Sequence, residues 1–209
     1  ADVAPILDAL QAASPNRFRG IRHNITWNND PAWENRENEG VVTSPKFIEG
    51  AKVLSQKGLR LDIMQSFPQM PEIAEFAKAV PDLPIIVNHV GGVSRVGIYD
   101  GKDDEIIPVW RDGVTALADC PNVAMKLGGL GMPRFGFGWH ARETPIGSEE
   151  LAEAMKPWMR HCIEQFGPDR CMFESNFPPD KVSFSYNIMY NAFKLLSKDY
   201  SATERAALL

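Results

Sequence analysis

An α/β fold built on a parallel β-sheet is what the sequence predicts. Segments with the 3.6-residue periodicity of helices alternate with short apolar β-type runs, and each run ends in a loop rich in Gly, Pro or Asn. The alternation occurs five times, without an internal repeat or a shift in composition. Strands that alternate with helices of about 10–15 residues are typical of βαβ units, in which the strands lie parallel.

Six segments have the apolar spacing of helices, and several carry signals for their ends. Ser44 is suited to the N-cap of one helix and Gly58 to the position after its end, while Ser148 is suited to a later N-cap. Ser201 and Glu204 have the spacing of a capping box, which predicts one more short helix. The six longer predicted helices span residues 3–13, 45–57, 71–80, 104–118, 149–166 and 183–197.

The number of strands narrows the architecture. The five predicted strands span residues 18–23, 59–64, 84–90, 122–127 and 170–175. Five strand–helix units take up about 180 residues, whereas a closed (β/α)₈ TIM barrel has eight units in about 250 residues. The chain is therefore either a complete open sheet or about the last five β/α units of such a barrel. It lacks an initial Met and ends just after its capping box, which favours one barrel domain, residues 1–209, without its N-terminal strands and extreme C-terminus.

Composition and charge limit the classes of function. Lys and Arg number 22 against 27 Asp and Glu, so the net charge is −5. A mildly acidic chain argues against nucleic acid or an anionic membrane as its main partner. The cysteines Cys120, Cys162 and Cys171 are odd in number and set among apolar residues, which is typical of a reduced chain. We expect a cytoplasmic protein with a small-molecule substrate and leave a homo-oligomer open.

Charged or imidazole side chains stand at or near the end of every predicted strand. Buried charges are costly unless paired, and they are rare in parallel strands that are covered on both faces. Because catalytic groups cluster at the C-terminal ends of barrel strands, we interpret these side chains as one site. In chain order they are Arg22 and His23, Asp62, Asn88 and His89, Lys126, and Glu174 with Asn176.

Some of these residues also have a structural interpretation. Asp62 can cap the next helix, or pair with Arg60 or a neighbouring strand, and Lys126 can form an ion pair with Glu174. Two-residue alternation places His23 on the inner face of its strand. His140 lies in a long segment rich in Gly and aromatic residues, and such loops are often lids or pocket walls. We therefore include His140 as a candidate for substrate contact.

Four segments resemble a known family. They are Phe-Arg-Gly-Ile-Arg-His (18–23), Pro-Ile-Ile-Val-Asn-His-Val-Gly (84–91), Asn-Val-Ala-Met-Lys-Leu-Gly-Gly-Leu-Gly-Met (122–132) and Arg-Cys-Met-Phe-Glu-Ser-Asn-Phe-Pro (170–178). Together they resemble the amidohydrolase-related TIM-barrel hydrolases, amidohydrolase family 2. More narrowly, they resemble the branch that contains the sugar-lactone and pyrone-dicarboxylate lactonases. The likeness covers essentially the whole chain in the right order and matches strands four to eight of the barrel.

The resemblance implies a metal-dependent, lactonase-like hydrolase with one divalent metal ion of the zinc type, whose ligands stay unknown. His89 matches a family histidine that contacts metal or substrate. Asn176 stands where the family usually has the aspartate that takes a proton from the attacking water, and an amide cannot do so. Three interpretations are open: Glu174 is the base, a metal-bound hydroxide acts with Asn176 as orienter, or hydrolysis is lost. We favour Glu174, because a carboxylate two residues earlier points the same way along a strand.

We therefore expect a hydrolase that opens a small anionic lactone, or a related cyclic ester or amide, by attack of an activated water. The alternatives are a metal-dependent decarboxylase of the same superfamily and a non-catalytic ligand-binding relative. The predicted catalytic residues are His89, Glu174 and Asn176, and the predicted substrate-binding residues are Arg22, His23, Asp62, Lys126 and His140.

Overall fold

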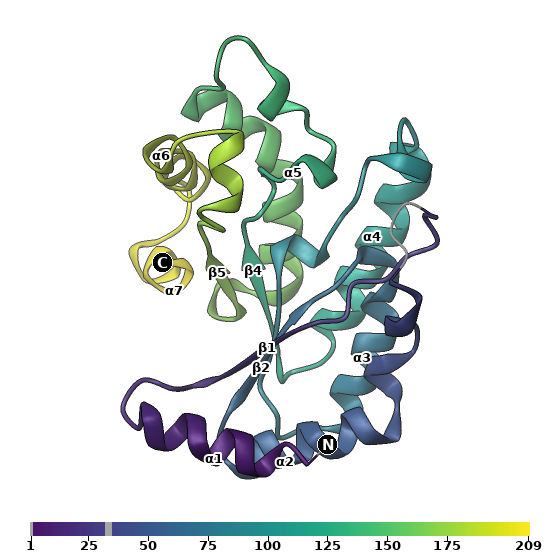
Figure 1. Ribbon diagram of the computed structural model, residues 1–209. Coiled ribbons are helices and arrows are strands. Elements are labelled where there is room, and N and C mark those ends of the chain that lie inside the picture. Colours follow the sequence, from purple (N-terminus) through teal and green to yellow (C-terminus); the bar gives the residue numbers. More distant parts are fainter. Residues whose placement is uncertain (1, 32–34) are drawn as a thin grey trace.

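The computed structural model describes residues 2–31 and 35–209, and its centre is a five-stranded parallel sheet (Figure 1). The strands pair in chain order, with β1 and β5 at the two edges. This arrangement confirms the predicted α/β class with its parallel sheet. The strands are β1 (Gly20–Asn24), β2 (Arg60–Met64), β3 (Ile85–Val87), β4 (Val123–Leu127) and β5 (Cys171–Phe173).

Helices fill the connections between strands, and most of their predicted ends are confirmed. The Ser44 hydroxyl accepts from the backbone N–H of Phe47, and Ser201 forms its capping box with Glu204. Ser148 as an N-cap is wrong: Gly147 holds that position in extended backbone, and Ser148 is already helical. The helices are α1 (Ala4–Ala13), α2 (Pro45–Gln56), α3 (Met70–Ala79), α4 (Asp103–Ala118), α5 (Ser148–Phe166), α6 (Tyr186–Leu196) and α7 (Ala202–Leu208).

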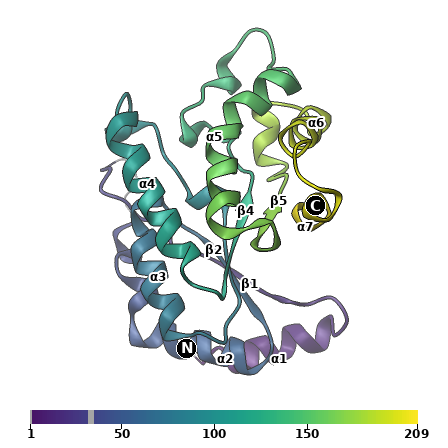
Figure 2. The same cartoon turned by 180° about the vertical axis from the view of Figure 1, so that it is seen from behind.

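The two faces of the sheet differ in what covers them. Figures 1 and 2 show α3, α4 and α5 along one side of the strands. Side chains on this outer face, such as Ile63, Val87 and Met125, are fully buried. Their neighbours along each strand face the inner side and are only half-buried. The sheet therefore places its apolar core on the helix side and leaves its inner face accessible within the described part of the chain.

Two strands end earlier than predicted, and both ends lie where polar residues follow. β3 stops at Val87 because His89 and Val90 have backbone φ angles of 54° and 52°. Positive φ is uncommon outside glycine and costs about 1–3 kcal/mol. β5 stops at Phe173, and Asn176 has φ 47°. The expected alternation of Glu174 and Asn176 along one strand is therefore wrong, because the chain leaves the extended conformation between them.

Other features of the chain bear on the expected cellular setting. In the described ranges, no helix is long and apolar enough to cross a membrane. Cys120, Cys162 and Cys171 are free and buried. Burial raises the pKa of each thiol, that of Cys171 to about 12. These thiols are therefore poorly reactive, and the cytoplasmic location stays a prediction.

The start of β4 is held by one amide. The Asn122 Nδ2 group donates to the carbonyl oxygens of Ala77, Val80 and Leu83 at 3.0–3.1 Å, at the end of α3. The carbonyls of Ala77 and Val80 also accept backbone N–H groups, from Val80 and Leu83, so the side chain adds a second donor to each and supplies a donor for the carbonyl of Leu83. The contact fixes where β4 enters the sheet.

We predict that Asn122→Ala lowers the free energy of unfolding by about 1–3 kcal/mol, because it removes three hydrogen bonds and leaves the Leu83 carbonyl without its side-chain donor. Urea unfolding followed by circular dichroism measures this loss. Asn191→Ala is the matched control, because Asn191 is exposed on α6. Equal stability of the two variants would contradict the assignment.

Candidate active site

A buried histidine and a carboxylate meet at the C-terminal ends of β3 and β5. The Nδ1 atom of His89 lies 2.5 Å from Oε1 of Glu174, and the backbone N–H of His89 donates to the same oxygen at 3.3 Å. The side chain of His89 is 2% exposed and that of Glu174 15%. This contact spans β4, because β3 and β5 do not pair with each other.

Arg22 reaches the other nitrogen of the same ring. Its guanidinium lies 3.1 Å from Nε2 of His89, at the end of β1. A guanidinium can only donate, so Nε2 accepts and the ring proton is on Nδ1, where it points at Glu174. In the described residues no carboxylate forms an ion pair with Arg22. The positive charge of Arg22 is thus not neutralised by a carboxylate from the part of the chain that the structure describes.

A second polar group lies beside this pair on the inner face. Lys126 Nζ is 2.5 Å from Oδ2 of Asp62 and 3.8 Å from Oε2 of Glu174. The other oxygen of Asp62 accepts from the Asn88 amide. These contacts agree with the prediction that Asp62 pairs with a neighbouring strand, because Lys126 lies on β4 and Asn88 follows β3. Lys126 and Asp62 largely neutralise each other, so they are less suited to binding a substrate charge than Arg22.

Donors on both sides set the protonation of Glu174. Burial disfavours its charged form, but the hydrogen bond from His89 and the charge of Lys126 outweigh burial and lower the pKa of the Glu174 carboxyl. Glu174 is therefore a carboxylate at neutral pH. A carboxylate that two partners stabilise is a weak proton acceptor, whereas it orients and polarises the imidazole well.

Two glycines after β4 allow the backbone of the following loop to pack directly against His89 and Glu174. A Cβ atom at Gly128 would lie 2.2 Å from the backbone oxygen of Glu174, and one at Gly129 would lie 2.3 Å from Nδ1 of His89. Gly129 also has φ 76°. The loop after β4 therefore packs its bare backbone against the His89–Glu174 contact, which only glycine permits.

The structure adds Asp180, a residue that sequence reasoning missed. Asp180 is 1% exposed, and its carboxyl accepts from Nδ2 of Asn176 at 2.7 Å and from the N–H of Gly131 at 3.2 Å. Burial raises its pKa to about 7, against the opposing effect of these hydrogen bonds, and the charge of Glu174 adds to the rise. The i, i+4 spacing of Asn176 and Asp180 after a strand was the signal available in the sequence.

Two predicted site residues lie elsewhere. His23 is level with the buried Ile63 of β2 and packs its ring on Phe47 of α2, with centroids 5.6 Å apart. Its predicted inward direction is wrong, because Arg22 takes the inner face in register with Asp62. His140 is exposed in the turn Trp139–Ala141 after β4. Neither residue joins the contacts between Arg22, His89 and Glu174.

The metal ion that the resemblance implies can be tested against the residues present. Across residues 2–31 and 35–209, no group of three or more His, Cys, Asp or Glu side chains is arranged to hold a metal ion. Both ring nitrogens of His89 already contact protein groups. The described residues therefore do not fit a zinc site by themselves, and we derive no step through a metal.

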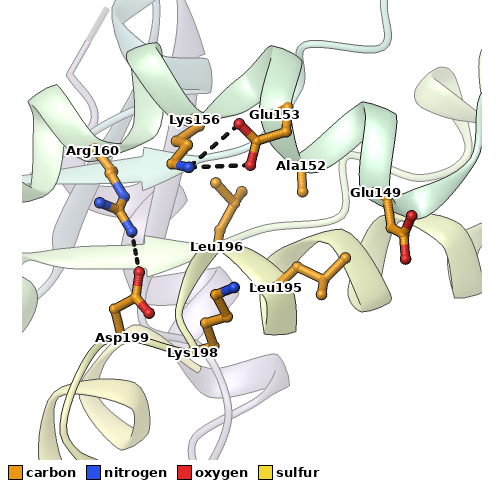
Figure 3. Close-up of a pocket in the computed structure, with 9 residues that line it drawn as sticks. All are labelled: Glu149, Ala152, Glu153, Lys156, Arg160, Leu195, Leu196, Lys198 and Asp199. Atoms are coloured by element: carbon orange, nitrogen blue, oxygen red, sulfur yellow. Dashed lines mark hydrogen bonds and ion pairs between the residues drawn. The ribbon is translucent and has the colours of Figure 1, made fainter.

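A pocket of about 230 Å³ on the helix layer differs in character from this site (Figure 3). It lies between α5 and the end of α6, and four of its charged side chains form ion pairs: Lys156 with Glu153 at 3.1 Å and Arg160 with Asp199 at 2.7 Å. Such solvent-exposed pairs contribute only about 0–1 kcal/mol each. We do not assign a function to this pocket.

Comparison with known proteins decides the family. The amidohydrolase family model matches residues 2–209. The chain belongs to the amidohydrolase family. This confirms the resemblance, because the match includes the four segments that carry it.

The relatives of this amidohydrolase are longer than the chain. The uncharacterized protein y4mH of Sinorhizobium fredii is 35% identical over 99% of this chain and 62% of its own length. An L-fucono-1,5-lactonase of Burkholderia ambifaria is 23% identical over 84% of this chain and 51% of its own length. An L-rhamnono-gamma-lactonase of Scheffersomyces stipitis is 26% identical over 74% of this chain and 46% of its own length. The chain thus spans about half to two thirds of these curated relatives.

A solved structure supports the architecture. The crystal structure of an amidohydrolase from Burkholderia multivorans with bound zinc superposes with a TM-score of 0.78 at 23% identity. It covers all of this chain, which corresponds to 67% of that chain. At this identity the likeness concerns the fold alone. It confirms the predicted TIM-barrel class, of which this chain supplies five β/α units. The predicted domain limits stay a prediction.

We predict that Gly129→Ala lowers the free energy of unfolding by about 1–3 kcal/mol more than Gly138→Ala, because overpacking adds to the backbone strain. Gly138 is the matched control: its φ is 72°, close to the 76° of Gly129, but a Cβ there meets nothing within 4 Å. Thermal and urea unfolding compare the two. Equal losses would show that the loop after β4 does not press on His89.

The raised pKa of Asp180 predicts how stability changes with pH. A carboxyl whose pKa rises on folding stabilises the fold below about pH 4, and that contribution is lost as the pH rises through about 7. Asp180→Asn has no such proton, so its stability relative to wild type should increase by on the order of 2–4 kcal/mol between pH 4 and 8. Urea unfolding at several pH values measures the difference. A constant difference across this range would contradict the raised pKa.

Proposed function

We propose that the full-length protein is a hydrolase that opens a small anionic lactone by attack of water. The observation that carries the proposal is the chain of contacts Arg22–His89–Glu174. Glu174 orients the imidazole through Nδ1, and the Arg22 guanidinium donates to the lone pair of Nε2. Membership of the amidohydrolase family and the lactonase names of two relatives support a lactone-type substrate.

The proton acceptor in this proposal is Nε2 of His89. A water molecule attacks the lactone carbonyl carbon and gives its proton to Nε2, while Glu174 stabilises the imidazolium through Nδ1–H. The ring C–O bond then breaks, and His89 returns the proton to the leaving oxygen. The geometry favours this division of roles over Glu174 as the base, because both oxygens of Glu174 face donors.

Arg22 links substrate binding to this step. In the proposal, a substrate carboxylate binds the Arg22 guanidinium and draws it away from His89. The lone pair of Nε2 is then free beside the lactone ring of the substrate. A neutral lactone has no group that competes for Arg22 in this way. Anionic substrates are therefore favoured twice: the charge of Arg22 attracts them, and their binding makes Nε2 of His89 accessible to water.

The metal ion and the two alternative functions stay predictions. The divalent metal can be tested by elemental analysis of the full-length protein purified without chelators. A non-catalytic relative would show thermal stabilisation by lactones without ring opening. A decarboxylase would release carbon dioxide from an aromatic or unsaturated acid, so a carbon dioxide assay in the same screen separates the three functions.

We predict that His89→Asn lowers kcat/KM for lactone hydrolysis by about 10²–10⁴-fold, because it removes the general base. The new amide can still donate to Glu174, so the carboxylate keeps a partner. Release of acid from a panel of sugar-acid lactones measures the rate. His23→Asn is the matched control on the outer face of β1. If His89→Asn keeps its rate while Glu174→Gln loses it, Glu174 is the base and our division of roles is wrong.

We further predict that Arg22→Gln raises KM for carboxylate-bearing lactones by about 10–100-fold and changes KM for neutral lactones little. The pair of substrates is its own control, because a general loss of structure would affect both. An equal change for both substrates would remove Arg22 from anion recognition.

A further inference from the structure

Asn176 and Asp180 form a pair in which a buried carboxyl holds an amide. Nδ2 of Asn176 donates to Oδ1 of Asp180 at 2.7 Å, and the N–H of Gly131 donates to Oδ2 at 3.2 Å. Because the two ends of a planar amide point in different directions, the first bond turns the carbonyl oxygen of Asn176 away from Asp180. Asn176 is half-buried, whereas Asp180 is buried. The carbonyl end of the amide is thus the end that points away from the buried carboxyl.

We propose that Asp180 is a positioning residue that sets the orientation of the Asn176 amide, and so decides whether Asn176 offers a ligand an acceptor or a donor. An ionised Asp180 can only accept, so it holds the NH₂ group and leaves the carbonyl oxygen for the ligand. A protonated Asp180 can donate its O–H to that oxygen, which requires the amide to rotate by half a turn. The NH₂ group then faces the ligand. The inference rests on the proposed function only in placing a ligand at Asn176.

The carboxyl itself has little room to move. A Cβ at Gly131 would lie 2.8 Å from Cγ of Asp180 and equally close to the ring of Phe184. Ser183 donates through Oγ to the carbonyl oxygen of Gly131 at 2.5 Å, which ties the loop after β4 to the turn that carries Asp180. The backbone N–H of Asp180 also donates to the backbone carbonyl oxygen of Asn176, which fixes the turn between the two residues. A change in the protonation of Asp180 is therefore met by rotation of the amide rather than by movement of the carboxyl.

The surroundings of Asp180 place this change near neutral pH. Burial raises its pKa to about 7, the charge of Glu174 acts in the same direction, and the hydrogen bonds from Asn176 and Gly131 oppose both. Ser183 and Phe184 complete the surroundings and carry no charge. Among the described residues, Glu174 is the titratable neighbour that affects Asp180. Both states of the carboxyl are thus populated near pH 7.

Nuclear magnetic resonance of the side-chain NH₂ groups tests the inference without any assay of activity. Full-length protein labelled with ¹⁵N-asparagine is titrated from pH 5.5 to 8.5, and the Asn176 signal is the one that Asn176→Asp removes. We expect this signal to shift with a midpoint near pH 7. Asp180→Asn should abolish the transition, because the new amide donates to Asn176 at every pH. Glu174→Gln should move the midpoint to lower pH. An unchanged signal in wild type, or the same transition in Asp180→Asn, overturns the proposal.

A double exchange provides the control for folding. Asn176→Asp with Asp180→Asn keeps both hydrogen bonds, because the new amide at 180 accepts from Gly131 and donates to the new carboxylate at 176. Asn176→Asp alone sets two carboxyls face to face. We expect the double variant to have a thermal midpoint nearer to wild type than Asn176→Asp alone. A double variant no more stable than the single one would show that the two side chains are not coupled and would overturn the proposal.

Activity separates this inference from the proposed function. If wild type opens a lactone, its pH profile should contain a transition near pH 7 that Asp180→Asn lacks. If no variant hydrolyses any lactone, the proposed function fails, and the resonance titration still decides the orientation of Asn176. If the protein hydrolyses lactones, its Asp180→Asn variant keeps the wild-type pH profile and the Asn176 signal shows no transition, the inference is contradicted and the proposed function is not.

Discussion

The contact between His89 and Glu174 organises the inner edge of the sheet. It joins the ends of β3 and β5 across β4, so it forms only where the loop after β4 lies flat against both side chains. Gly128 and Gly129 make that possible, since a Cβ at either would overlap Glu174 or His89. The contact places the ring proton on Nδ1, and this leaves Nε2 as the acceptor for Arg22. The two nitrogens of the His89 ring therefore differ: Nδ1 donates toward β5, and Nε2 accepts from β1.

The charges around this contact divide into two groups. Lys126, Asp62 and Asn88 satisfy one another on the inner face, and breaking such a partly buried pair commonly costs several kcal/mol. They hold neighbouring strands in place and leave little net charge. Arg22 is different, because it is exposed and its partner is a neutral nitrogen. The chain is acidic overall, yet the exposed charged side chain among these groups is that of Arg22, which suits an anionic ligand.

Sequence patterns predicted much of this arrangement, and the failures have physical causes. The alternation of short apolar runs with helical segments predicted the parallel sheet, because a helix between two strands is typical of βαβ units. It predicted that Arg22, His89 and Glu174 meet, because the ends of parallel strands share one edge. It failed for His23, since an imidazole packs on Phe47 as readily as it faces water. It missed Asp180, because the residue lies in a turn after β5, where neither helix nor strand periodicity applies and only its spacing from Asn176 is a signal.

Three buried thiols have a practical consequence for watching this molecule at work. Because Cys120, Cys162 and Cys171 are shielded and their thiolates are disfavoured, a newly introduced surface cysteine would be alkylated in preference to these three. Asn24 ends β1, two residues from Arg22, and is exposed. A fluorophore attached there would sit beside the arginine and could follow its displacement in real time, on an otherwise unlabelled background.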